Sequence, residues 1–188
     1  MNTPSHLLLN LAALGSLSPQ AKVAIAIGAV LPDVPIFAFY FVMKGVYRLP
    51  ESEIWSQAYY EPLIQDIVAL FHSLPIACLG LAIAWGLRSQ VGMWFCASLI
   101  GHSLLDLPVH NDDAHRHFYP LSNFRFISPL SYWDPRHFGR WVALGEILAV
   151  VGVTPQVFRL VPNVWLRSII VLMESFAIAT YGFFYWRA

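Results

Sequence analysis

The sequence predicts an all-α fold, a polytopic bundle of transmembrane helices that forms one domain over residues 1–188. Hydrophobic residues make up 57% of the chain and charged residues only 12%, whereas a soluble domain typically carries about 25% charged residues. The mean hydropathy of +0.58 points the same way. Several apolar stretches are long enough to cross a bilayer, which requires about 20 residues per helix. The five predicted long spans are residues 23–43, 63–87, 91–107, 141–161 and 165–186.

A further apolar segment, residues 5–17, is too short for a full span and predicts a short N-terminal membrane helix. Thr3 can cap this helix, and Pro4 fits its first turn. Ser18 and Pro19 repeat the same signal, which indicates a tight turn before the next helix. We therefore expect five long spans plus one short membrane helix.

One extensive polar segment, residues 108–140, separates the third and fourth long spans. It mixes His, Asp and Arg with aromatic residues, and its prolines exclude one continuous helix. We expect an ordered cap at the membrane surface. Basic residues are more numerous on the cap side than on the opposite side, so the positive-inside rule favours a cytoplasmic cap with both termini in the cytoplasm. A net charge of zero without a basic patch predicts no nucleic-acid partner, and nothing indicates a protein partner.

Asp33 and His72 are ionisable residues inside predicted spans, where a polar group is costly unless it is paired. Pro32 and Pro35 flank Asp33 and predict a broken helix, which membranes tolerate where the break lines a cavity or a site. Alternatively, the Asp33 carboxylate accepts hydrogen bonds from backbone amides that the break frees. His72, taken alone, is equally typical of an interhelical hydrogen bond.

The strongest local pattern is the pair His102 and Asp106. Their spacing of four residues places both side chains on one helix face, one turn apart. An imidazole and a carboxylate so placed can bind one metal ion, or the carboxylate can orient the imidazole behind the ion. A buried hydrogen bond between the two, without a metal, is the alternative.

The polar cap opens with further candidate ligands, just where the helix of His102 is expected to end. A solvated surface loop is the alternative for this run of His and Asp. Asp112 and Asp113 are candidates for a general base. His6 lies in the first turn of the short N-terminal helix, in the same half of the bundle as the cap. The candidate metal ligands are His6, Asp33, His72, His102, Asp106, His110, His115 and His117.

The order of five motifs resembles the YdjM-like family of LexA-regulated, membrane-bound, predicted metal-dependent hydrolases. The resemblance covers about residues 1–130. It implies a bacterial inner-membrane protein, with His6, Asp33, His72, His102 and Asp106 as the matched polar positions. The chain departs from the family pattern at Pro35, where a second Asp is common, and at residues 67–68, where His-Arg is common. The motifs are T-P-S-H at 3–6, G-A-V-L-P-D at 28–33, H-S at 72–73, G-H-S-L-L-D at 101–106 and Y-P-L-S-x-x-R-F at 119–126.

These observations favour a membrane-embedded metal-dependent hydrolase that acts on a lipid or a lipid-linked phosphoester. A bound metal would polarise a phosphoryl or acyl group and lower the pKa of a bound water. Nitrogen and carboxylate ligands without thiolates suit Zn²⁺ above all, with Mn²⁺ or Fe²⁺ as alternatives. Two other functions stay open. A metal-ion or proton transporter would also place Asp and His around a broken helix, and a non-catalytic scaffold would bind a metal or a haem through His72 and His102.

Overall fold

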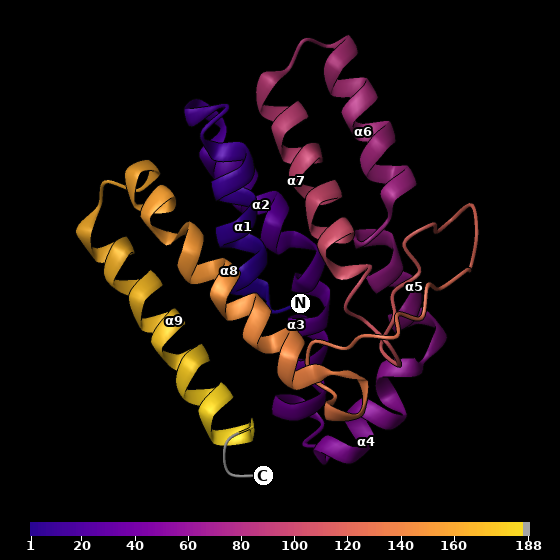
Figure 1. The fold of residues 1–188 in the computed structure, drawn as a ribbon. Coiled ribbons are helices and arrows are strands. Elements are labelled where there is room, and N and C mark those ends of the chain that lie inside the picture. The colour runs from indigo at the N-terminus through magenta and orange to yellow at the C-terminus, as the bar shows by residue number, and fades with distance from the viewer. Residues whose placement is uncertain (186–188) are drawn as a thin grey trace.

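A computed structural model describes residues 1–185, which form helices joined by turns and one long loop, with no β-strand among them (Figure 1). The expected all-α fold is therefore confirmed. The predicted span 91–107 corresponds to α7 (Gln90–Asp106), a helix of 17 residues. Trp186, the expected end of the last span, lies outside the described residues. Four helical segments are long and apolar enough to cross a membrane: Pro19–Val46, Pro62–Gly86, Gly139–Leu160 and Val164–Tyr185.

The short N-terminal helix, α1 (Thr3–Gly15), packs against the following helix and against α8 (Gly139–Leu160). The prediction that Thr3 caps α1 was wrong. Asn2 occupies the N-cap position, but its side chain makes no capping hydrogen bond. The hydroxyl of Thr3 donates instead to Oδ2 of Asp33, so a residue expected to begin a helix connects α1 to the next span.

The first long span is interrupted at Asp33, as Pro32 and Pro35 predicted. A proline has no amide proton and clashes with the preceding turn, so two prolines around one residue disfavour a regular α-helix. The chain tightens there into a 3₁₀ turn. In order, the span consists of η1 (Pro19–Ala21), α2 (Lys22–Val30), η2 (Leu31–Asp33), α3 (Val34–Phe41) and the π-helical turn η3 (Val42–Val46).

The second long span is also broken, which was not expected. It consists of α5 (Pro62–Phe71) and α6 (Leu74–Gly86), and the break falls at His72. The hydroxyl of Ser73 accepts a hydrogen bond of 3.2 Å from the amide of Ile76 and so caps α6. The predicted continuous helix over residues 63–87 is therefore corrected to two helices that meet at a candidate ligand.

The segment between α3 and α5 forms two short helices, α4 (Glu51–Ser56) and η4 (Ala58–Tyr60). Ile54 of α4 and Tyr59 of η4 are buried against Phe39 and Val68, which come from α3 and α5. This small core holds α4 and η4 against the ends of the spans. No structure was expected for this segment, which forms part of the wall of a cavity.

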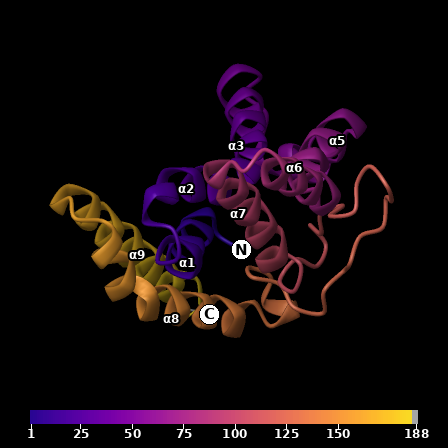
Figure 2. The same cartoon turned by 90° about the horizontal axis from the view of Figure 1, so that it is seen from above.

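Helix α7 lies at the centre of the N-terminal half and contacts α1, α2 and α6 (Figure 2). The contact with α2 is close, because a Cβ added at Gly28 would lie 2.5 Å from the carbonyl oxygen of Phe95. Asn10 of α1 donates to the backbone carbonyl and the hydroxyl of Ser98 at 2.9 and 3.0 Å. Small residues and buried interhelical hydrogen bonds of this kind stabilise helix packing in membranes.

The C-terminal helices, α8 and α9 (Val164–Tyr185), form an antiparallel hairpin along one side of the molecule (Figure 1). Ile170 is the one described residue of α9 that is buried, and large apolar side chains such as Leu172 and Phe176 are exposed. The loop between α7 and α8 contains the 3₁₀ turn η5 (Pro135–His137) and passes over the end of α7 (Figure 1).

Candidate metal centre

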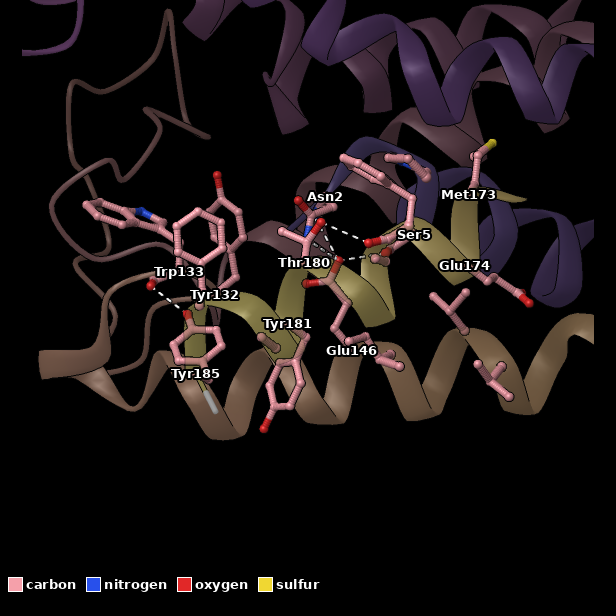
Figure 3. Close-up of a pocket in the computed structure, with 18 of the residues that line it drawn as sticks. Asn2, Ser5, Tyr132, Trp133, Glu146, Met173, Glu174, Thr180, Tyr181 and Tyr185 are labelled. Carbon is pink, nitrogen blue, oxygen red and sulfur yellow. Dashed lines mark hydrogen bonds between the residues drawn. The ribbon is translucent and has the colours of Figure 1, made fainter. Parts of the chain in front are cut away.

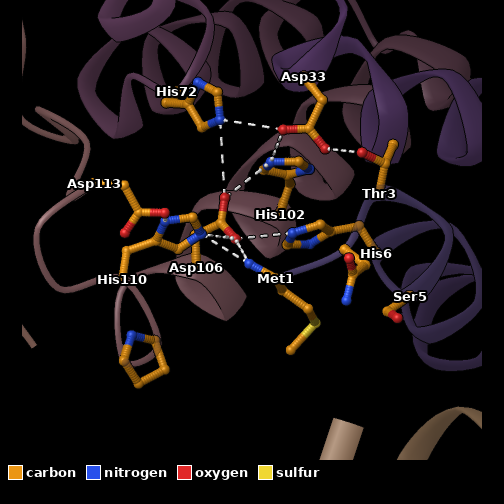
Figure 4. Close-up of polar contacts among 12 residues, drawn as sticks. Met1, Thr3, Ser5, His6, Asp33, His72, His102, Asp106, His110 and Asp113 are labelled. Atoms are coloured by element: carbon orange, nitrogen blue, oxygen red, sulfur yellow. Dashed lines mark hydrogen bonds and ion pairs between the residues drawn. The ribbon is translucent and has the colours of Figure 1, made fainter. Parts of the chain in front are cut away.

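A cluster of His and Asp side chains lies where α1, the break of the first span, the break of the second span and the last turn of α7 meet (Figure 4). His6, His72 and His102 are fully buried, and Asp106 is 1% exposed. Residues far apart in the sequence thus converge on one point. Two of them, Asp33 and His72, reach it because their spans are broken there.

Four side chains form a closed ring of contacts. Nε2 of His102 lies 3.1 Å from Oδ2 of Asp106 and 3.6 Å from Oδ1 of Asp33. Nε2 of His72 lies 3.6 Å from the same Asp33 oxygen and 3.8 Å from the same Asp106 oxygen. Ligands at 2.0–2.2 Å around a tetrahedral zinc ion are about 3.3–3.6 Å apart. Within this ring, His72, His102 and Asp106 form one potential ligand group, whereas Asp33 forms another with His102 and His6.

Backbone carbonyls fix the orientation of both imidazoles. Nδ1 of His72 lies 2.9 Å from the carbonyl oxygen of Val68, and Nδ1 of His102 lies 2.7 Å from that of Ala29. A carbonyl only accepts, so each Nδ1 carries the proton and each Nε2 presents a lone pair. Both Nε2 atoms are buried without a hydrogen-bond partner and face carboxylate oxygens. A proton on Nε2 or a metal ion between the atoms would remove the repulsion between these lone pairs and the carboxylates.

The other oxygen of Asp106, Oδ1, faces a second group of nitrogens. Nε2 of His6 lies 2.9 Å away and Nε2 of His110 lies 3.1 Å away. The amino group of Met1 lies 2.8 Å from Oδ1 and 2.7 Å from Nε2 of His110. Figure 4 shows Asp106 between these two sides. The predicted pair of His102 and Asp106 is thus brought together, and Asp106 also contacts two further predicted ligands.

The run of His and Asp after α7 folds back over the centre. His110 and His115 are buried, and each offers a nitrogen within 4.8 Å of the other and of a carboxylate oxygen of Asp106. The described residues form three potential ligand groups: His6, Asp33 and His102; His72, His102 and Asp106; and Asp106, His110 and His115. His117 is buried but belongs to none of them. Its Nδ1 lies 3.2 Å from the carbonyl oxygen of His72, so it packs on the break of the second span.

The two candidate bases differ in their surroundings. Asp113 has Oδ2 at 3.0 Å from Nδ1 of His110, while its Oδ1 is buried without a hydrogen-bond partner. Asp112 is exposed. Burial would raise the pKa of Asp113, but the neighbouring His110 outweighs it and the pKa lies below its ordinary value. Asp113 is therefore ionised at neutral pH.

Burial has the opposite effect on the two downstream histidines, because it disfavours the charged imidazolium. Burial and the nearby His72 hold the pKa of His115 well below its ordinary value. The same two causes lower the pKa of His117 to about 4. Both imidazoles are neutral at neutral pH, which is the state in which a histidine can bind a metal.

A cavity of about 950 Å³ opens onto the centre. Asp33, His110, Asp113 and His115 line it on one side, and Asp112 reaches it at the rim. Residues of α4 and η4 line another side, as do two aromatic residues of the long loop: Trp55, Tyr59, Tyr60, Tyr132 and Trp133. Three of the candidate ligands, Asp33, His110 and His115, are thus accessible to a molecule in this cavity.

Three polar residues at or near the centre were not among the predicted site residues. Thr3 donates to Asp33, and the hydroxyl of Ser103 donates to the carbonyl oxygen of His72 at 3.0 Å. Glu146 of α8 lies behind α1 and accepts from Ser5 at 2.6 Å. Thr3 and Ser103 lie within the motifs at residues 3–6 and 101–106, and this position was the sequence signal that could have identified them. Nothing local to Glu146 indicates that it faces α1.

No family model, curated protein or solved structure matches this chain. The resemblance to the YdjM-like family therefore stays an expectation based on the quoted motifs. The three ligand groups, formed by buried His and Asp side chains, have the spacing to hold a metal ion. Any function must be inferred from that geometry.

Proposed function

We propose that this chain is a membrane-embedded metal-dependent hydrolase. One observation carries the proposal: the Nε2 atoms of His72 and His102 and the carboxylates of Asp33 and Asp106 converge beside an open cavity. A structural metal site uses all its coordination positions for protein ligands, whereas a catalytic site leaves one open to substrate. Access from a cavity of about 950 Å³ supports the catalytic alternative.

The donor set suits a divalent transition metal. Imidazole nitrogens and carboxylate oxygens favour Zn²⁺, and Mn²⁺ or Fe²⁺ accept the same ligands. Neither cysteine contributes to the three ligand groups, so no thiolate needs to be considered among the described residues. Once bound, such an ion would supply a Lewis acid that polarises a phosphoryl or acyl oxygen.

Residues of the long loop have the properties of a general base and of substrate contacts. Asp113 is ionised, lines the cavity and keeps Oδ1 unpartnered, so it can accept a proton from a water molecule beside the centre. Asp112 is the second candidate, at the exposed rim of the same cavity. Burial raises the pKa of Tyr132 well above its ordinary value, so its hydroxyl stays protonated and can donate to a bound anion.

An apolar cavity next to the centre supports a lipid or lipid-linked substrate. It measures about 610 Å³ and lies between α1, α8 and α9 (Figure 3). Asn2, Pro4, Tyr132 and Trp133 line both this cavity and the polar one. An amphiphile can therefore place a polar group at the metal centre and its hydrocarbon chain between the helices. A phosphoester that joins a headgroup to a lipid has this form.

The membrane arrangement belongs to the same proposal. We count α7 as a fifth span, since 17 residues at 1.5 Å each reach about 26 Å, close to the thickness of the hydrocarbon core. Helix α1 then enters the bilayer only in part. The excess of basic residues on the cap side favours a cytoplasmic cap and cytoplasmic termini, in a bacterial inner membrane.

The competing functions find less support. A transporter needs a polar path to the opposite face, but beyond Asn10 and Ser98 the interior between α1, α2 and α8 is the apolar cluster that contains Leu8, Ile25 and Val157. A haem held between His72 and His102 would need room for a porphyrin. The two ring centroids are 5.2 Å apart, and carboxylates of Asp33 and Asp106 fill the space in front of both Nε2 atoms.

Hydrolysis by the detergent-purified chain tests the proposal. Suitable probes are a phosphomonoester, a phosphodiester and a carboxylic ester with chromogenic leaving groups, together with phosphatidic acid in mixed micelles. We expect turnover of at least one phosphoester, its loss with EDTA and its recovery on addition of Zn²⁺. The variant His102→Ala should be inactive.

The matched control is His137→Ala. His137 is a loop histidine that contacts Asp134 at 3.1 Å and belongs to no ligand group, so its variant should keep full activity. Equal turnover in wild type and His102→Ala would contradict the proposal, as would the absence of turnover of every probe by the zinc-loaded protein.

A further inference from the structure

We propose that the centre holds two cations bridged by the carboxylate of Asp106. This inference rests on the proposed function and names the substrate class of the same site. Oδ2 of Asp106 faces His72 and His102, while Oδ1 faces His6 and His110. A carboxylate whose two oxygens each meet a different set of imidazoles is arranged as a bridging ligand. A single ion can use only one of these sides with good geometry.

The second side has ligand spacing of its own. Oδ1 of Asp106 lies 2.9 Å from Nε2 of His6 and 3.1 Å from Nε2 of His110, slightly less than the separation of about 3.3–3.6 Å between neighbouring ligands of a tetrahedral zinc ion. His115 adds a further nitrogen within 4.8 Å of His110 and Asp106. His110 and His115 belong to this side alone, whereas Asp106 is shared and His6 also lies within 4.8 Å of ligand atoms of Asp33 and His102.

The imidazole of His110 lies between two carboxylates. Its Nδ1 is 3.0 Å from Oδ2 of Asp113, without the geometry of a hydrogen bond, and its Nε2 faces Asp106. A carboxylate behind a metal-binding imidazole is a common arrangement in metal sites. His72 and His102 are oriented by backbone carbonyls instead. His6 has no such partner, because its Nδ1 is buried without a hydrogen bond.

The second side also favours positive charge. The amino group of Met1, a cation, is in contact with both Oδ1 of Asp106 and Nε2 of His110. The amino group occupies the place that an ion between these atoms would take, so an ion that binds there displaces it. His110 and His115 also line the cavity, so an ion held by them would face a substrate directly.

Charge points to the substrate class. Three carboxylates, those of Asp33, Asp106 and Asp113, contact the two sides. Two divalent cations exceed their charge by one, which leaves a centre that attracts an anion. Paired metal ions about 3.5–4 Å apart stabilise both the attacking and the leaving oxygen of a phosphoryl group. A phosphoester is therefore favoured over a neutral carboxylic ester.

Zinc stoichiometry of the detergent-purified chain tests the inference. The protein is stripped with a chelator, dialysed against Zn²⁺ and analysed for zinc per chain. We expect two equivalents in wild type and in the control His137→Ala. We expect one equivalent in His72→Ala, which keeps the second side, and one in His110→Ala, which keeps the first. The remaining equivalent in each variant also shows that the variant is folded.

Cobalt provides an independent measurement. Two Co²⁺ ions that share the Asp106 carboxylate should be magnetically coupled in wild type, and the coupling should disappear in both single variants. Saturation of wild type at one zinc per chain, or two equivalents retained in His110→Ala, would overturn the second site. Hydrolysis that persists with one zinc per chain would leave the proposed function intact, whereas a chain that binds no zinc would refute both.

Discussion

Two buried carboxylates lie on either side of the start of α1, and their surroundings differ sharply. Asp106, on one side, faces four imidazoles and the Met1 amino group. Glu146, on the other side, meets no imidazole; its Oε1 accepts from the Asn2 amide, the Asn2 side chain and Ser5 at 2.6–3.0 Å (Figure 3). Both residues are at least nine-tenths buried. Burial of an acid inside a membrane protein is thus not enough to indicate a metal site.

The difference lies in what satisfies each carboxylate. Oε1 of Glu146 meets hydrogen-bond donors at the N-terminus of α1, where the helix dipole also favours negative charge, while its Oε2 is buried without a partner. It therefore acts as a capping partner supplied by another helix. Asp106 faces nitrogens that, on His72 and His102, carry lone pairs rather than protons. A proton or a metal ion between the atoms would satisfy that arrangement, and the proposed metal makes the two acids respond differently to the same substitution.

The largest expected effect is that of Asp106→Asn. The substitution removes the charge that both sides of the centre share, so we expect loss of nearly all bound zinc. Glu146→Gln is the matched control, because it makes the same chemical change in an acid without imidazole partners. Zinc per chain in the two folded proteins gives the answer. Full zinc occupancy in Asp106→Asn would remove the distinction between the two acids.

The next effect concerns how His102 and Asp106 act together. If both bind one ion, His102→Ala should lose the zinc of the first side, and the double variant should lose little more than Asp106→Asn alone. Residues that act as a unit are non-additive in this way. If they form only a hydrogen bond, zinc should survive and the cost should be about 1–3 kcal/mol of stability. Zinc content and thermal unfolding of the two singles and the double separate these outcomes.

The sequence predicted the parts of this centre that depend on local rules. The spacing of His102 and Asp106 follows from helix periodicity, and the break at Asp33 follows from its two flanking prolines. The break at His72 was missed. Helix α6 begins after Ser73, whose hydroxyl caps the new start and also donates to the carbonyl oxygen of Tyr119 in the loop. Ser73 and Pro75, which lies in the first turn of α6, were a local signal in the sequence, whereas the contact with Tyr119 depends on tertiary structure.

The same limit applies to the residues outside the bundle. His110 and His115 fold back over α7 because of the path of the loop that carries them. This loop contains several prolines, and its path cannot be predicted from helix or strand periodicity. The pairing of Glu146 with the start of α1 joins residues about 140 positions apart. Composition and span length were enough to predict the all-α class. Prediction of the complete site would also have required knowledge of which helix ends meet.

A smaller effect is expected for Thr3→Val, which tests the support of Asp33. Thr3 donates to Oδ2 of Asp33, the oxygen not used in the ring of four. Loss of a partner behind a metal ligand typically weakens metal affinity about 10–100-fold. We expect a weakening of that order in a zinc competition titration. Thr3→Ser keeps the hydroxyl and should bind as wild type; equal weakening in both would assign the effect to packing.

The smallest effect on the metal is expected for Ser5→Ala. The change removes one of the donors to Glu146 and leaves the centre untouched. We expect a stability loss of about 1–2 kcal/mol from the lost buried hydrogen bond, with unchanged zinc content. Thermal unfolding and zinc analysis of the same sample measure both. Reduced zinc in a Ser5→Ala protein would mean that the two sides of α1 are coupled.

The carbonyl support of His72 and His102 has a consequence for how this chain tolerates mutation. The oxygens that orient the two imidazoles belong to the backbone of Val68 and Ala29, and every amino acid at these positions carries the same oxygen. Exchange of Val68 for another apolar residue that keeps the helix would leave the orientation of His72 intact. In a set of descendants of this sequence, the two histidines would therefore persist while the residues that orient them drift without any correlated change.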